Sequence, residues 1–223
     1  MKKFNLCIIS CVFTLQLIFP QSVSDNPELI SAILAPDNLV THTSCNQNGF
    51  GGHYNEIHDD ELNIKVGQFQ IHKSDDTEAC ENFGTKFNEF ETVSDAPKNL
   101  LGEAGETITY SWKFKFDDHF VVRNNNMDIH QLKAIGGSEA EVPLFTLTTS
   151  RKGRFERLEL RYAEMDTQVI LKSIDITNLK GQWIEVSETI TYNEIGAYDI
   201  SIKTLNDEKT VLEYNDDAIR TWK

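Results

Sequence analysis

Apolar and polar residues alternate with a period of two along most of the chain from residue 62 onward. The clearest case is TITYSWKFKFDD at 107–118, in which Trp112, Phe114 and Phe116 share one side while serine and lysine residues share the other. This period is typical of a β-strand with one buried face. Further segments with strand-like spacing lie at 62–72, 84–93, 128–134, 142–150, 157–165, 168–176, 182–192, 197–205 and 210–215.

Turn-forming residues separate these segments, as in LLGEAGE, KAIGGSE, SRKGR, NLKGQ and TLNDEK. No long stretch has a helical pattern and no repeat of fixed period is visible. Many short strands with such turns predict an all-β fold of two packed antiparallel sheets, and the length suits a jelly-roll sandwich with one concave, exposed face. Residues 25–36 are expected to form a helical turn or an irregular lead-in, and residues 41–60 a loop.

The first 24 residues have the three-part pattern of a secretory signal peptide. Lys2 and Lys3 precede an apolar run from Phe4 to Phe19, and small residues follow at Ser22 and Ser24. The alternative, an uncleaved membrane anchor, needs a longer apolar run. We therefore expect residues 1–24 to be removed and residues 25–223 to form a single secreted, extracellular domain without membrane attachment.

Cysteine usage agrees with an oxidising compartment. Cys7 and Cys11 lie in the expected signal peptide, and Cys45 and Cys80 remain. An even count in an exported chain predicts one disulfide between Cys45 and Cys80. Two thiols without an adjacent pair of histidines argue against a zinc site.

The formal net charge is −14, from 35 acidic and 21 basic residues. A global negative field argues against nucleic acid or an anionic membrane as a partner. An anionic substrate would therefore require a locally basic site. The acidic stretches IHDDE at 57–61 and KSDDTE at 73–78 could hold a structural calcium ion, although solvated acidic loops are the other interpretation. We expect no required cofactor, and a monomer.

Segment 84–93, GTKFNEFETV, carries polar residues that core packing does not require. Lys86, Asn88 and Phe90 share one face, and Asn in the middle of a strand is disfavoured. Lys86 and Asn88 are candidate ligand contacts. The alternative is a partly exposed strand with a solvated acidic face.

Segment 128–134, DIHQLKA, collects His, Gln and Lys within four residues. Strict alternation predicts that Gln131 and Lys133 share a face with Ile129, and that Asp128 and His130 share the other. Gln can donate and accept hydrogen bonds, and Lys can neutralise an anion. His130 has two interpretations, a catalytic group or a hydrogen-bonded histidine of the core.

Segment 191–203, TYNEIGAYDISIK, places Tyr192 and Tyr198 on the same side of a strand with Gly196 between them. A glycine inside a strand marks a bulge or a close approach by a ligand or backbone. The tyrosines are either acid or base groups assisted by their surroundings, or packing aromatics.

Taken in order, TYSWKFKFDDHF, DIHQLKA, VPLFTLT and GQWIEVSETITYNEIGAYDISI resemble the glucuronan lyase family of polysaccharide lyases, over roughly residues 75–214. The chain is more distantly similar to the jelly-roll alginate and heparin lyases, whose pattern Tyr-x-Lys-x-Gly-x-Tyr reads here as Tyr192, Glu194, Gly196 and Tyr198. Glu194 replaces the lysine of that pattern.

The resemblance implies cleavage of an acidic polysaccharide by β-elimination. One group must neutralise the uronate carboxylate, a base must take the C5 proton, and an acid must protonate the leaving oxygen. The resemblance implies that Gln131, with Asn88 as a second candidate, neutralises the carboxylate, and that Tyr198 is the acid, with Tyr192 as the next candidate. It does not settle the base: His130 is the nearest candidate in the sequence, and His53 and His72 are alternatives. Lys133, and Lys86 in the strand where related lyases carry a basic motif, are candidates for substrate binding.

The sequence thus predicts a secreted lyase acting on a glucuronan-like polysaccharide. The alternative is a non-catalytic carbohydrate-binding jelly roll. A glycoside hydrolase would need two facing carboxylates, and Glu156 and Glu159 differ in strand parity.

Overall fold

The computed structural model describes residues 3–8, 39–41, 54–69, 90–92, 101–122, 126–137 and 139–222. The strands at 3–8, 39–41 and 90–92, and the first three residues of the strand at 54–59, are described by their backbone alone. Within these ranges there is no helix of the length and apolar character that crossing a bilayer would require.

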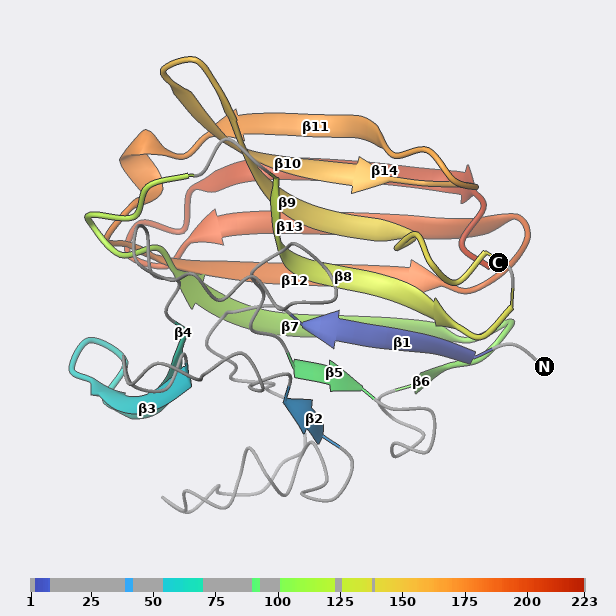
Figure 1. Ribbon diagram of the computed structural model, residues 1–223, viewed down its shortest axis with the longest axis horizontal. Coiled ribbons are helices and arrows are strands. Elements are labelled where there is room, and N and C mark those ends of the chain that lie inside the picture. Colours follow the sequence, from blue (N-terminus) through green and yellow to red (C-terminus); the bar gives the residue numbers. More distant parts are fainter. Residues whose placement is uncertain are drawn as a thin grey trace, which may run out of the picture.

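The fold is all-β, with antiparallel pairing in every sheet (Figure 1). The larger sheet has the order β11-β10-β9-β8-β1-β5-β2, with β6 paired to β1, and the second has the order β14-β13-β12-β7. The strands of the larger sheet are β1 (Lys3–Ile8), β2 (Leu39–Thr41), β5 (Phe90–Thr92), β6 (Leu101–Gly102), β8 (Met127–Ile135), β9 (Phe145–Lys152), β10 (Phe155–Tyr162) and β11 (Val169–Asp175). Those of the second sheet are β7 (Thr107–Lys115), β12 (Trp183–Thr191), β13 (Gly196–Thr204) and β14 (Thr210–Ile219).

Strands β8–β11 overlie β12–β14 in Figure 1, and their facing sides share one apolar core. The prediction from alternation is confirmed on β7, where Trp112 and Phe114 are buried and the lysines between and after them point away from the core. Phe116 continues the buried row, with its ring 5.1 Å from that of Phe114 in an edge-to-face contact. Leu147 of β9 and Ile200 of β13 are fully buried from the two sides. The two-sheet antiparallel sandwich is therefore confirmed, and the jelly-roll connectivity and concave face stay predictions.

The expected loop at 41–60 is wrong for its last residues. Residues Tyr54–Asp59 form β3, which pairs with β4 (Ile64–Phe69) in a separate two-stranded sheet. Asp59 holds the connecting turn, because its carboxylate accepts a hydrogen bond from the backbone N–H of Leu62 at 2.9 Å. The same carboxylate accepts from the indole N–H of Trp183 at 3.0 Å and thereby attaches this hairpin to β12. Pairing with β4 outweighs the low strand propensity of the Asn, His and Asp residues here.

Strand β1 lies inside the segment that the sequence predicts to be a signal peptide. Its residues pair with β8 from Lys3↔Ile135 to Cys7↔Gln131, and on the other side with β5 and β6. The sequence analysis expects this segment to lie outside the fold, whereas in the structure it forms β1 and pairs within the larger sheet. Its removal remains a prediction, and removal would leave the edge of β8 at residues 131–135 without this partner.

Candidate functional site

A β-bulge in β8 changes the faces that strict alternation predicts. Register shifts between Asp128 and His130, so that both Ile129 and His130 turn into the core, each only 1% exposed. Asp128 therefore lies on the same side as Gln131, whose amide N–H donates to the Asp128 carboxylate at 3.2 Å. The predicted pairing of Ile129 with Gln131, and of Asp128 with His130, is corrected by this extra residue.

The outer face of β8–β11, the side turned away from the second sheet, carries a hydrogen-bonded set of polar side chains. The hydroxyl of Thr148 donates to Asp128 at 2.6 Å and lies 2.8 Å from the hydroxyl of Thr146. The amide of Gln168 reaches the Thr146 hydroxyl at 3.4 Å. We call the following set the outer polar face: Asp128, Gln131, Lys133, Thr146, Thr148, Ser150, Arg157, Glu159, Arg161 and Gln168.

The centre of the outer polar face is an acid–base group on β10. Glu159 accepts from the hydroxyl of Ser150 at 2.6 Å and from the guanidinium of Arg161 at 2.9 and 2.5 Å. Arg161 also donates to the side-chain oxygen of Asn126 at 3.1 Å. A carboxylate held from two sides fixes the guanidinium in one orientation, which prepares it for a polar ligand.

The outer polar face has a buried floor and a partly exposed margin. Thr146, Thr148 and Glu159 are almost fully buried, whereas Gln131 and Arg161 are partly exposed. Burial raises the pKa of the Asp128 carboxyl, against the lowering effects of the Thr148 hydrogen bond and the Arg161 charge. A ligand would therefore meet amide and guanidinium groups first, with hydroxyls and carboxylates behind them.

Residues from both sheets form a second polar group, which lies inside the core. The imidazole Nε2 of His130 lies 2.8 Å from one oxygen of Glu188, and the hydroxyl of Tyr198 donates to the other oxygen at 2.6 Å. His130, on β8, and Glu188 and Tyr198, on β12 and β13, are all 1% exposed or less. We call these three residues the core triad.

Aromatic rings surround the core triad. The ring of Tyr198 stacks on that of Phe145, with centroids 3.7 Å apart, and the Trp112 ring lies 5.0 Å from the His130 imidazole. Nδ1 of His130 has no hydrogen-bond partner in the described part of the chain. We therefore place the proton on Nε2, which donates to Glu188. An Nδ1 atom that accepts no hydrogen bond destabilises the core less than an Nδ1–H group that has no acceptor.

Tyr192 lies in the same core, 1% exposed, with its hydroxyl 2.9 Å from that of Tyr110. Its ring occupies the space beside Gly102, where a Cβ atom would overlap the ring carbons. Burial is the largest cause that raises the pKa of Tyr192 and of Tyr198 well above the usual tyrosine value, and the negative charge of Glu188 adds to it.

The structure therefore separates the residues that the lyase resemblance groups together. Tyr198, Tyr192 and His130 lie between the sheets, whereas Gln131 and Lys133 lie on the outer face of β8. His130 and Tyr198 do meet, but through Glu188, which the sequence analysis did not select. His130 therefore occupies the position of a hydrogen-bonded core histidine, which is one of its two interpretations. Tyr192 and Tyr198 occupy the positions of aromatic residues packed in the core.

Gly196 confirms the predicted close approach, and the approaching group is the chain itself. A Cβ at this position would overlap the hydroxyl of Thr221 and the backbone oxygen of Thr191. Register between β13 and β14 also shifts between Gly196 and Tyr198, as in a bulge.

We predict that Gly196→Ala lowers the free energy of unfolding by about 1–3 kcal/mol, since the backbone must move to admit the methyl group. Urea titration measures this loss. Ile195→Ala is the matched control, because Ile195 is 76% exposed and should change stability by less than about 0.5 kcal/mol. Equal stability of the two variants would contradict the close contact.

Several predicted residues lie outside the described residues. These are Cys45 and Cys80 of the expected disulfide, Lys86 and Asn88, and the alternative histidines His53 and His72. The described chain has no group of three or more His, Cys, Asp or Glu residues arranged to hold a metal ion. In the acidic stretch at 57–61, Asp59 and Glu61 lie 3.8 and 3.0 Å from the amine of Lys115.

The carboxylates considered for hydrolysis lie apart, as their parity predicts. Glu156 contacts the amine of Lys180 and the backbone N–H of Val122, whereas Glu159 faces the outer side of β10. Sequence reasoning missed the threonine row and Arg161 on the outer face. Alternation at 145–150 and 157–162 was the signal, since every second residue there is polar.

A comparison of the chain with protein-family models, with curated proteins and with solved structures found no match.

Proposed function

We propose that this chain is a secreted, non-catalytic protein that binds an acidic polysaccharide along the outer polar face. One observation carries the proposal: on one side of a sheet, amide, hydroxyl, carboxylate and guanidinium groups from the three adjacent strands β8, β9 and β10 form two hydrogen-bonded sets, one around Asp128 and one around Glu159. Sugars present closely spaced hydroxyl groups that both donate and accept, and such groups pair with these side chains. A sheet holds the side chains at fixed spacing, which lowers the entropy lost on binding.

The charges of this face support an acidic ligand. Lys133 and Arg157 have no ion pair among the described residues, and Arg157 donates only to the hydroxyl of Ser173 at 3.2 Å. In a chain of net charge −14, these two cations are free to meet a uronate carboxylate. Arg161 is largely neutralised by Glu159 and serves better as a hydrogen-bond donor to hydroxyls.

Burial of the core triad favours binding over elimination. A catalytic acid must touch the leaving oxygen of the polymer, and a base must reach the C5 proton. The hydroxyl of Tyr198 is fully buried, already donates to Glu188, and belongs to a phenol whose pKa is raised well above its usual value. Catalysis by Tyr198 and His130 would require the two sheets to separate around the core triad, so that the polymer could reach these side chains.

The test is incubation of the protein with glucuronan, alginate and heparin, with dextran as a neutral comparison. Binding is measured by calorimetry, and unsaturated product by its ultraviolet absorbance. We expect saturable binding without a rise in absorbance. A rise in absorbance would establish a lyase and overturn the non-catalytic proposal, and absence of binding to every polymer would overturn the proposal altogether.

Gln131→Ala should weaken polysaccharide binding about 3–10-fold, the usual value of one or two lost hydrogen bonds. Gln131 is partly exposed and its one described hydrogen bond is to Asp128, so the fold should persist. The matched control is Thr109→Ala on the outer face of the second sheet, where Thr109 pairs with Thr189 at 2.9 Å. Equal losses in the two variants would exclude the outer polar face as the binding surface.

A further inference from the structure

The β9–β10 hairpin projects from the body of the molecule beyond the neighbouring strands (Figure 1). Lys152 pairs with Phe155, and Gly153 and Arg154 make the two-residue turn between them. Gly153 has φ +62°, the conformation that such tight hairpin turns require and that glycine adopts without strain. Pairing of Lys152 with Phe155 fixes the backbone on both sides of the turn, so the tip presents its side chains in a defined arrangement.

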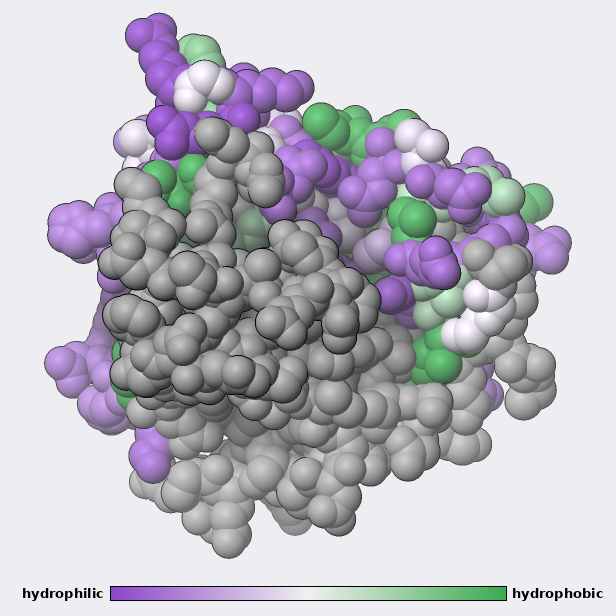
Figure 2. All heavy atoms as spheres, in the orientation of Figure 1, coloured by the Kyte–Doolittle hydropathy of each residue, from purple (hydrophilic) through white to green (hydrophobic). Residues whose placement is uncertain are grey.

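The hairpin concentrates positive charge in an acidic protein. Residues 151–157 contain four cations, Arg151, Lys152, Arg154 and Arg157, and one acid, Glu156. Glu156 is engaged at the base of the hairpin, with its carboxylate 2.5 Å from the Lys180 amine and 3.0 Å from the Val122 N–H. None of the four cations forms an ion pair with a described residue. Hydrophilic residues dominate the tip in Figure 2.

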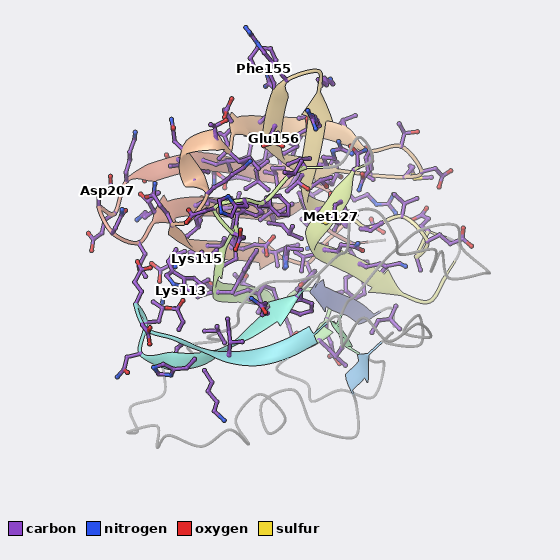
Figure 3. All side chains as sticks on the ribbon, turned by 60° about the vertical axis from the view of Figure 1, so that its left-hand side comes forward. Lys113, Lys115, Met127, Phe155, Glu156 and Asp207 are labelled. Carbon is purple, nitrogen blue, oxygen red and sulfur yellow. The ribbon has the colours of Figure 1, made fainter. Side chains whose placement is uncertain are left out.

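An aromatic side chain sits among these cations. Phe155 is 46% exposed, and Figure 3 shows it at the far end of the hairpin, away from the sheets. The guanidinium groups of Arg154 and Arg157 lie 5.2 and 6.0 Å from its ring centroid. An exposed ring at this place adds little to the core, and it offers apolar area that a ligand can remove from water.

The hairpin continues the outer polar face. Phe155 and Arg157 have the same parity on β10 as Glu159 and Arg161, so these four side chains follow one another along one side of the strand. The distance from Arg161 to Phe155 is about 20 Å at 3.3 Å per residue, the length of several sugar units. A polymer lying along β10 would therefore reach the tip.

We propose that the β9–β10 hairpin is the subsite that selects an anionic polysaccharide, with Phe155 packed on the C–H face of a sugar ring and the surrounding arginines and lysine paired with its carboxylate or sulfate groups. This inference rests on the proposed function and adds a place and a charge requirement to it. The positive charge of the hairpin favours an anionic polysaccharide as the ligand, because guanidinium groups bind planar oxyanions with two hydrogen bonds. An anionic membrane is the other partner with this charge, and a single aromatic residue at the tip gives it little apolar anchoring.

The test compares two triple variants with the same change in net charge. Arg151→Gln/Lys152→Gln/Arg154→Gln removes three exposed cations of the hairpin, and Lys65→Gln/Lys203→Gln/Lys209→Gln removes three exposed lysines elsewhere. We expect the hairpin variant to bind heparin and glucuronan at least about tenfold more weakly, with a smaller dependence on salt. The control variant should stay within about twofold of the parent chain. Circular dichroism verifies the fold of each.

Phe155→Ala supplies a second, charge-neutral measurement. We expect it to weaken binding about 3–10-fold while the salt dependence stays that of the parent chain. Ile195→Ala, which removes another exposed apolar side chain, should leave binding unchanged.

The outcomes separate this inference from the proposed function. If the parent chain binds polysaccharide and the hairpin variant binds equally well, the hairpin inference is overturned and the outer polar face stands. If the parent chain binds no polysaccharide, both are overturned. If it binds vesicles of phosphatidylglycerol and phosphatidylcholine through the hairpin cations but no polysaccharide, the surface belongs to a membrane contact and the inference is wrong.

Discussion

Replacing Glu188 with alanine will lower the free energy of unfolding by about 3–5 kcal/mol. The carboxylate accepts from His130 and Tyr198, and all three groups are buried. Its loss leaves an N–H and an O–H without an acceptor and opens a cavity between the sheets. Since small proteins are stable by only about 5–15 kcal/mol, the variant should approach the limit of folding. Urea titration followed by tryptophan fluorescence measures the change.

Two variants on the same strand serve as controls. Glu188→Gln keeps the shape and one acceptor oxygen, so it should cost less than the alanine variant. Glu185→Ala removes a carboxylate that pairs with Lys113 at 3.0 Å on the outer side of β12, and its side chain is 43% exposed. Exposed pairs contribute about 0–1 kcal/mol. A Glu188→Ala variant no less stable than Glu185→Ala would show that the core triad does not join the two sheets.

Stability will fall steeply as the pH rises from about 10 to about 12. Burial raises the pKa of Tyr110 from its ordinary value of 10.0 to about 12, and it raises those of Tyr192 and Tyr198 well above the ordinary value. In the unfolded chain these phenols ionise near pH 10, whereas in the folded chain they stay protonated. The stabilisation is therefore complete below pH 10 and is lost as the pH rises toward the folded pKa.

The size of this effect follows from the pKa difference. Each pH unit between the unfolded and folded pKa values corresponds to about 1.4 kcal/mol, so Tyr110 alone accounts for about 3 kcal/mol by pH 12. Unfolding curves in urea at increasing pH, together with tyrosinate absorbance, measure the loss. Absorbance from these tyrosines should rise only as circular dichroism reports unfolding.

Tyr110→Phe provides the internal control for the alkaline transition. It removes one of the phenols with a raised pKa, so the variant should lose stability less steeply above pH 10. Tyrosinate forming for all six tyrosines near pH 10, with circular dichroism unchanged, would contradict the burial of Tyr110, Tyr192 and Tyr198. The same result would restore Tyr198 as a phenol that solvent and a polymer can reach.

The core triad illustrates why the type of a residue does not decide its function. A histidine, a glutamate and a tyrosine within hydrogen-bond distance are a common arrangement for acid–base chemistry. Here the triad spans the sandwich, from β8 in one sheet to β12 and β13 in the other, with the Trp112 ring beside His130 and the Phe145 ring stacked on Tyr198. It satisfies buried polar groups and fixes how the two sheets face each other.

The sequence by itself determined the strands from residue 107 onward and, apart from the bulged strand β8, their buried sides. Period-two alternation is local, and burial of one face of each strand follows from it, as the row Trp112, Phe114 and Phe116 demonstrates. Alternation also placed Glu156 and Glu159 on different sides of β10. The sequence analysis did not predict the strand at 54–59, because its polar residues have low strand propensity and the strand forms by pairing with β4.

Only the tertiary structure decided how the polar residues are grouped. One bulge in β8 moves Asp128 beside Gln131 and turns His130 into the core, and a single-residue shift of this kind leaves no clear mark in a short sequence segment. Glu188 meets His130 across 58 residues of chain, through the packing of two sheets. Local patterns carry the period of a strand, whereas such contacts depend on register and sheet packing, which are properties of the whole fold.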